Sequence, residues 1–269
     1  PREDPEHDVY AFDHHCDGRI FVRATCAQMR LAALMGLFEE LPSDRRLYLN
    51  GFDEDTCLAA RIFLHPAEAR LPQMSRLVGF EDIMDASSGL FPTDPSWDDM
   101  LAAGAWIFQP YRDTITVKGT PEELEGIYRS VIEAVGARIH DYLYGRIGEG
   151  KVDRRYERIG GGPDWALVHP TGADARLGMI ADGIRAYVMV RSLGSDRWLY
   201  TIGRTPYKKR FPLRGFFDRL NLIEGCPPSS RWGGSPIVGG SPKPYGSALP
   251  PAEVERCVNS LLVEQGLAA

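Results

Sequence analysis

Residues 9–18 read VYAFDHHCDG, and residues 47–56 read LYLNGFDEDT. Each stretch begins with a short apolar run typical of a buried strand, passes through an acidic turn, and leads into a segment of helical periodicity. Ligand sites in open α/β sheets usually lie at the ends of strands that lead into a helix, and carboxylates and imidazoles are typical ligand-binding groups there. The two stretches therefore predict an α/β protein whose site forms where these turns meet.

The composition is that of a folded globular protein. With 269 residues, of which 43% are hydrophobic, the chain can bury a sizeable core in one large domain or two small ones. No apolar run approaches the roughly 18 residues of a membrane span, and the polar, acidic residues 1–6 are unlike a signal peptide. Five cysteines without a CxxC pair predict reduced thiols in a cytoplasmic protein that lacks a CxxC-type zinc site.

The net charge of −6 is divided unequally along the chain. Residues 1–150 contain 26 acidic and 14 basic side chains, a balance of −12, whereas residues 151–269 contain 11 and 17, a balance of +6. A half that holds cations and a half that holds anions would suit a metal-dependent enzyme acting on phosphates. A chance distribution of charge is the alternative explanation.

Strand and helix signals alternate in the first half, and strands become frequent from residue 155. We expect a metal-binding α/β domain over residues 1–148, with a mostly parallel sheet and flanking helices, and a smaller mixed-sheet α/β domain over residues 149–269 that binds substrate in a cleft between the two lobes. Glycines in residues 145–151 indicate a linker between them. Helices are predicted at residues 24–41, 56–65 (capped by Thr56), 75–84, 121–144, 176–181, 216–222 and 250–262, and further strands at 165–168, 186–190 and 198–202.

The first acidic turn concentrates four side chains that bind metals, Asp13, His14, His15 and Asp17, within five residues. Like charges crowded at one strand end repel each other unless a cation lies between them. Carboxylate together with neutral imidazole suits Mn²⁺, Mg²⁺ or Fe²⁺. A solvated turn whose aspartates cap the next helix is the alternative.

The second acidic turn contributes Asp53 and Asp55. A spacing of two lets both carboxylates lie on one side of an extended segment, where they can reach one ion or bridge two. Residues 81–85, EDIMD, can supply a third carboxylate, which we expect to be Asp85. A helix N-cap alone would also explain Asp55, and an ordinary solvated helix end would explain residues 81–85.

Two segments of the second half are candidate anion sites. Residues 203–210, GRTPYKKR, form a basic run directly after a predicted strand, and residues 232–247, WGGSPIVGGSPKPYGS, combine paired glycines with hydroxyl groups, so that backbone N–H groups can approach an anion. An ordinary charged surface and a merely glycine-rich loop are the alternatives. The expected substrate-binding residues are Arg204, Lys208, Lys209, Arg210, Gly233, Gly234, Ser235, Gly239, Gly240, Ser241 and Lys243.

Taken together, these motifs resemble those of the DHH phosphoesterase superfamily with its DHH-associated C-terminal domain. The resemblance is carried by residues 13–15 (DHH), residues 52–56 (FDEDT), the long helix predicted at 121–144 and the late glycine loop. In the family an Asp-x-Asp motif precedes Asp-His-His. Here the order is reversed, or residues 13–18 are themselves a variant of the leading motif. The histidine that commonly follows the family's glycines is replaced in this neighbourhood by Ser235 and Ser241.

The resemblance implies a hydrolase of phosphate esters that uses two divalent ions, with Mn²⁺ favoured over Mg²⁺ and Fe²⁺. The expected metal ligands are Asp13, His15, Asp17, Asp53, Asp55 and Asp85, and the expected catalytic residues are His14, His15 and Asp53.

The expected substrate is a small nucleotide, another phosphate ester or a short single-stranded oligonucleotide. Neither duplex nucleic acid nor a membrane is expected as a partner, because no long basic surface rich in aromatic residues is evident; a homodimer stays open. Two alternatives of other classes stand beside the hydrolase. One is a catalytically inactive nucleotide-binding or regulatory protein, and the other is a metalloenzyme of non-phosphate chemistry.

Overall fold

The computed structural model of the protein describes residues 2–4, 9–12, 22–42, 44–49, 52–114, 121–242 and 245–267. Contacts between Cα atoms divide the chain into two compact units. Among the described residues, the first unit holds 2–4, 9–12, 22–86 and 94–152, and the second holds 87–93 and 153–267. The units are interleaved in sequence, because residues 87–93 belong with the second.

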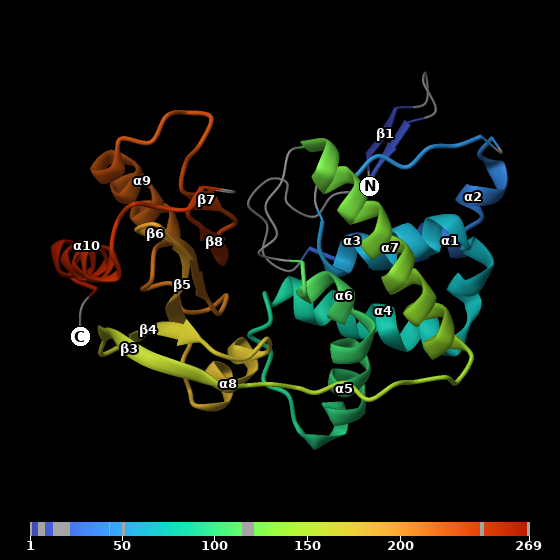
Figure 1. The fold of residues 1–269 in the computed structure, drawn as a ribbon, viewed down its shortest axis with the longest axis horizontal. Helices are drawn as coiled ribbons and strands as arrows, with labels where there is room; N and C mark the ends of the chain where they lie inside the picture. The colour runs from blue at the N-terminus through green and yellow to red at the C-terminus, as the bar shows by residue number, and fades with distance from the viewer. Residues whose placement is uncertain are drawn as a thin grey trace. The chain divides into compact units, whose positions relative to one another are not determined.

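The first unit is mainly helical in its described part (Figure 1). Apolar side chains at helical spacing make its core, with Met29, Leu58, Leu77, Ile107 and Ile139 each almost fully buried. The elements are β1 (Arg2–Asp4), β2 (Val9–Ala11), α1 (Thr25–Leu34), α2 (Leu37–Glu40), α3 (Glu54–Leu64), the 3₁₀ helix η2 (Pro66–Arg70), α4 (Pro72–Ala86), the 3₁₀ helix η3 (Pro95–Trp97), α5 (Asp98–Ile107), α6 (Gln109–Arg112) and α7 (Pro121–Leu143).

The mostly parallel sheet predicted for residues 1–148 is wrong for the part that the structure describes. β2 falls on the strand predicted at residues 9–12, but it pairs antiparallel with β1. Residues 47–49 have no regular structure, and Tyr48 is 82% exposed. Three apolar residues in a row are too few to distinguish a buried strand from an extended loop, which is why the prediction failed there.

The helix predicted at residues 24–41 is two helices. Gly36 has a φ of 88°, in the left-handed region that glycine enters without strain, and it separates α1 from α2. The structure also contains two helices that are not predicted from the sequence. Residues 98–112, for which no helix is predicted above, form α5 and α6, and α5 begins with Asp98 and Asp99 in its first turn, where carboxylates complement the helix dipole.

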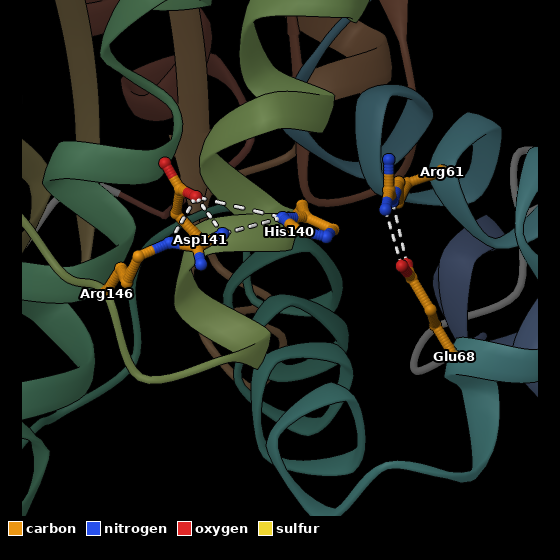
Figure 2. Close-up of polar contacts among 5 residues, drawn as sticks. All are labelled: Arg61, Glu68, His140, Asp141 and Arg146. Carbon is orange, nitrogen blue, oxygen red and sulfur yellow. Dashed lines mark hydrogen bonds and ion pairs between the residues drawn. The ribbon is translucent and has the colours of Figure 1, made fainter.

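An ion pair with two hydrogen bonds joins α3 to η2. Arg61 Nε lies 2.7 Å from Glu68 Oε2, and Arg61 Nη2 lies 2.5 Å from Glu68 Oε1. Figure 2 shows the two side chains meeting end to end. Both are mostly buried, so this parallel two-point contact fixes the short connection at Pro66 between the helices.

Residues 145–151 have no regular structure, as expected for a linker, but they pack closely on α5. A Cβ on Gly150 would lie 2.0 Å from the Ala102 carbonyl oxygen and 2.5 Å from the Trp106 backbone nitrogen. At the start of the segment, Arg146 Nη2 donates to Asp141 Oδ1 at 2.7 Å (Figure 2). Residues 145–151 therefore pack against the first unit and are not a free linker.

We expect Gly150→Ala to lower the free energy of unfolding by about 2 kcal/mol or more, because the new methyl group meets backbone atoms that cannot rotate away. Urea denaturation followed by circular dichroism measures the change. Gly79→Ala is the matched control, since a Cβ there has nothing within 4 Å and alanine favours the α4 helix. Equal stability of Gly150→Ala and wild type would contradict the close packing.

The second unit contains a six-stranded mixed sheet, which confirms the mixed-sheet α/β prediction for this half. The strand order is β3-β4-β5-β6-β8-β7; β4 and β5 are parallel, with α8 between them in sequence, and the other neighbours are antiparallel. The elements are β3 (Tyr156–Gly162), β4 (Trp165–Pro170), α8 (Ala175–Ala181), β5 (Ala186–Gly194), β6 (Arg197–Arg204), α9 (Leu213–Glu224), β7 (Gly233–Gly234), β8 (Val238–Gly240) and α10 (Pro251–Glu264).

Alternation along the central strands builds a cluster on each face of this sheet. Leu167 and Val188 pack with α9 and α10, whereas Val168 and Tyr187 pack with α8 and Leu90. The predicted helices at 176–181, 216–222 and 250–262 and the predicted strands of this half are thereby confirmed. Within the described ranges, every helix is too short or too polar to cross a bilayer.

Candidate functional site

The N-terminus of α1 is capped by carboxylates from two other helices. Asp55 in the first turn of α3 accepts the backbone N–H groups of Thr25 at 2.9 Å and Cys26 at 2.7 Å. Asp82 of α4 accepts the N–H of Ala24 at 2.7 Å. Ala24 has no side-chain acceptor of its own, so these remote aspartates satisfy amides that a local Ser, Thr, Asp or Asn cap would otherwise serve.

The other acidic residues of this turn also have structural contacts. Asp53 is the N-cap of α3 and accepts the Thr56 N–H at 2.8 Å, so the prediction that Thr56 caps this helix is wrong and the helix begins two residues earlier. Glu54 accepts from Arg112 Nε of α6 at 2.7 Å. The acidic turn therefore has a structural role, because it connects α3 to α1 and α6.

Glu81 has the most unfavourable electrostatic surroundings of the described acidic residues. It is 4% exposed, and its Oε2 has no hydrogen-bond partner in the described part of the molecule. Burial, followed by repulsion from nearby carboxylates, raises its pKa well above the ordinary value; these neighbours are Glu54, Asp55, Asp85 and Asp53. A buried carboxyl group without a partner must either keep its proton or face a cation.

Asp55 and Asp85 share this acidic region with Glu81. Burial raises the pKa of Asp55, the N–H and thiol of Cys26 oppose the rise, and repulsion from Asp85 adds to it. Burial and then the charge of Asp55 raise the pKa of the Cys26 thiol, so sulfur is protonated here and is a poor metal ligand. The available donors are oxygens, which suit a hard divalent cation.

Three of the six predicted metal ligands, Asp53, Asp55 and Asp85, lie close enough to Glu81 for their charges to raise its pKa. Asp13, His14, His15 and Asp17 lie outside the described residues. Within the described part of the chain, no three His, Cys, Asp or Glu side chains form a group that could hold a metal ion. The complete ligand set stays a prediction.

Sequence reasoning selected Asp85 from the EDIMD run and passed over Glu81. The missed signal was helical spacing, because Met74, Leu77 and Val78 place Glu81 on the buried face of α4. An acidic residue on that face needs a partner or a proton, whereas a solvated helix end does not.

The predicted glycine loop is a β-hairpin at the edge of the sheet. Gly239 and Gly240 pair with β6 as part of β8, and a Cβ on Gly240 would lie 2.1 Å from the Tyr200 carbonyl oxygen. Gly233 and Gly234 form the exposed partner strand β7. Close backbone packing therefore accounts for at least two of these glycines without any ligand.

The two serines of the hairpin have structural hydrogen bonds. Ser235 Oγ donates to the Val238 carbonyl at 3.1 Å, and the buried Ser241 Oγ accepts the Tyr200 N–H at 3.0 Å. Lys243 lies outside the described residues. Anion binding by this loop stays a prediction, and the exposed β7 is the part with backbone open to solvent.

Two side chains of α9 hold the ends of this loop. Asn221 donates to the Trp232 carbonyl at 3.0 Å and accepts the Trp232 N–H at 2.8 Å. Glu224 accepts the Trp232 indole N–H at 2.7 Å, the Ser247 hydroxyl at 2.9 Å and the Ala248 N–H at 2.6 Å. No sequence motif marks these two residues, because their role depends on a loop that returns to the helix from the far side of the hairpin.

The basic run divides between two places. Arg204 lies beside the hairpin, where its backbone N–H bonds the Ile237 carbonyl, and its guanidinium donates to the carbonyls of Thr205 and Pro206. Lys208 instead pairs with Asp164 at 2.7 Å. Lys209 and Arg210 are exposed. The structure therefore joins Arg204 to the glycine loop and directs Lys208 to the β3–β4 turn.

Comparison of the chain with protein-family models, with curated proteins and with solved structures finds no match.

Proposed function

We propose that this chain is a metal-dependent hydrolase of phosphate esters that acts on a small nucleotide, a short single-stranded oligonucleotide or another small phosphorylated substrate. The proposed metal ligands are Asp13, His15 and Asp17 together with Asp53, Asp55 and Asp85. The proposed anion-binding groups are those of the basic run and the glycine hairpin. Mn²⁺ is the favoured ion.

Glu81 is the observation that best supports this proposal. Its carboxyl group is buried, one oxygen lacks a partner in the described residues, and four other carboxylates raise its pKa. Such a cluster is costly for an apo protein, since like charges repel most strongly where water is excluded. A divalent cation beside it would remove that cost, and the oxygen donors suit Mn²⁺ or Mg²⁺.

A bound pair of divalent ions would supply a hydroxide at neutral pH and neutralise the phosphoryl group. The chain's own residues would hold and orient the substrate. Arg204, at the end of β6, is anchored to the hairpin through the Ile237 carbonyl, and the edge strand β7 presents backbone to solvent. A cationic side chain and backbone N–H groups together are the usual means of fixing a phosphate.

The test is turnover of bis(p-nitrophenyl) phosphate and of a panel of linear and cyclic dinucleotides with Mn²⁺, Mg²⁺ or Fe²⁺. We expect Asp85→Asn to lower kcat/KM by at least about 100-fold, which is the order expected when a metal-ligand carboxylate is lost. Asp99→Asn is the matched control, because Asp99 is an exposed carboxylate on α5. EDTA should abolish the activity of wild type and control alike.

Three outcomes would overturn the proposal, and a fourth would revise its ligand set. Absence of turnover with every metal and substrate would exclude the hydrolase, and nucleotide binding without turnover would favour the regulatory protein. Stoichiometric iron in the purified protein, with oxygen consumption and no phosphate release, would indicate a metalloenzyme of other chemistry. Equal activity of Asp85→Asn and wild type would remove Asp85 from the ligand set.

A further inference from the structure

The second unit contains a pocket of about 250 Å³ that is lined in part by Lys208 and Arg210 of the basic run. It lies between the β3–β4 turn, residues 208–211 and α10 with the chain that follows it. Its lining residues are Gly161, Gly162, Pro163, Asp164, Trp165, Lys208, Arg210, Phe211, Asn259, Leu262, Val263 and Leu267.

The floor of the pocket is apolar. Trp165 and Phe211 are buried in the core of the unit, with ring centroids 5.9 Å apart. Val263 lies at the mouth and is 67% exposed, so an apolar wall continues to solvent. A dry cavity of about 150 Å³ is large enough for benzene, and the larger space here accommodates a single ring with a substituent.

The rim of the pocket carries a net positive charge. Lys208 Nζ pairs with Asp164 Oδ1 at 2.7 Å, which leaves Arg210 as the excess cation among the three charged lining residues. Arg210 is exposed, and with Lys208 it lowers the pKa of Asp164, so two cations of the lining act on one carboxylate. One anionic group on a ligand would restore the balance, and a guanidinium binds a carboxylate or phosphate oxygen pair well.

Asn259 adds one oriented hydrogen-bond donor. Its Oδ1 accepts the Trp165 indole N–H at 3.0 Å. An indole nitrogen is a donor only, so this contact fixes which end of the amide is oxygen and turns the Nδ2 group to other partners. The pocket therefore combines an apolar body, one excess cation and one amide donor, the usual composition of a small-molecule site.

We infer that this pocket binds a small aromatic anion, a single ring carrying one carboxylate or phosphate group, with the ring against Trp165 and Phe211 and the anionic group at Arg210. The pocket shares Lys208 and Arg210 with the proposed anion-binding groups, but none of its lining residues is a proposed metal ligand, so binding in EDTA tests it apart from the metal chemistry.

Ligand-observed saturation-transfer NMR and titration of intrinsic tryptophan fluorescence, with EDTA present, test the inference on the full chain. The probes are benzoate, phenyl phosphate, neutral benzamide and inorganic phosphate. We expect benzoate or phenyl phosphate to bind with a dissociation constant between about 10 μM and 1 mM, the range for ligands of this size. Benzamide and inorganic phosphate should each bind at least about tenfold more weakly.

Two variants locate the binding. Arg210→Gln should weaken the bound anion about five- to tenfold, and Val263→Trp should close the mouth and abolish binding. Arg214→Gln is the charge-matched control, since Arg214 is exposed nearby and does not line the pocket. Circular dichroism and thermal unfolding confirm that each variant is folded. The highest ligand concentration is 5 mM, about five times the weakest expected dissociation constant. Failure of both anions to bind at that concentration would overturn the inference, and so would unchanged binding in folded Arg210→Gln and Val263→Trp. Either result counts whether or not the protein hydrolyses phosphate esters.

Discussion

Replacing Glu81 with glutamine is expected to make the metal-free protein more stable at pH 8 while leaving its stability near pH 4.5 almost unchanged. In the native state, burial and the carboxylates of Glu54, Asp55, Asp85 and Asp53 raise the pKa of Glu81 well above the ordinary value. Glutamine resembles the protonated acid in shape and cannot ionise. The substitution therefore removes a group whose ionisation opposes folding.

The sign follows from proton binding. Between the unfolded pKa of a glutamate, about 4.3, and the raised native pKa of Glu81, the native state binds more protons than the unfolded state. The contribution of Glu81 to stability is therefore fully present below the unfolded pKa and decreases as pH rises, by up to about 1.4 kcal/mol per pH unit. Wild type should lose this stability between pH 4.5 and pH 8, and Glu81→Gln should not.

Urea denaturation in EDTA at half-unit pH steps measures both profiles. Glu133→Gln, at an exposed position of α7, is the matched control and should follow wild type. Addition of Mn²⁺ should stabilise wild type by about 2.7 kcal/mol at a hundredfold excess over the dissociation constant, and Glu81→Gln by less. Parallel pH profiles of wild type and Glu81→Gln would show that this carboxyl group is not under electrostatic stress.

Replacing Asn221 with alanine is expected to lower the free energy of unfolding by about 3 kcal/mol. The side chain is 6% exposed and satisfies both the N–H and the carbonyl of Trp232. Its removal leaves two buried backbone groups without partners, at about 1–3 kcal/mol each. Trp232 also packs on Tyr200, with ring centroids 5.3 Å apart, so the loss extends into the core of the second unit.

Leu222→Ala is the matched control for this variant. Leu222 is next to Asn221 on α9 and its side chain is 79% exposed, so the substitution should change the free energy of unfolding by less than about 0.5 kcal/mol. Urea denaturation compares the two variants. If Asn221→Ala is as stable as Leu222→Ala, the two hydrogen bonds to Trp232 contribute nothing measurable. If the hairpin binds the substrate anion, Asn221→Ala should also raise KM, since the loop it anchors carries the glycine hairpin.

Local patterns predicted most elements of the second unit and, in the first unit, the helices α3, α4 and α7, but not the sheet. The continuous apolar runs of residues 165–168 and 186–190 lead directly to β4 and β5, because both faces of these central strands are buried. The apolar stripe of residues 250–262 leads to α10, because this helix buries one face in the core of the unit. In the first unit, residues 47–49 have the composition of a strand, but β-structure depends on a distant partner that three residues cannot specify. Asp55 likewise caps a helix whose N-terminus is 30 residues away, which no spacing rule detects.

Charge density in the sequence points to Asp53, Asp55 and Asp85, and all three act electrostatically on Glu81. The described residues do not form a group that could hold a metal ion, so the role of these aspartates as ligands stays a prediction. Sequence cannot tell which carboxylate is buried, since that depends on how α4 is rotated about its axis. For the same reason Glu81 on the inner face was passed over for Asp85 at the helix end.

The remote capping of α1 bears on how relatives of this protein should be compared. A descendant that had lost all chemistry would still retain an aspartate at position 55, because the amides of Thr25 and Cys26 need it for the fold. Conservation of Asp55 among relatives would therefore be weak evidence that this residue has a catalytic role. Glu81 Oε2 has no hydrogen bond in the described chain and opposes folding when it is ionised, so the fold itself gives no reason to retain this residue.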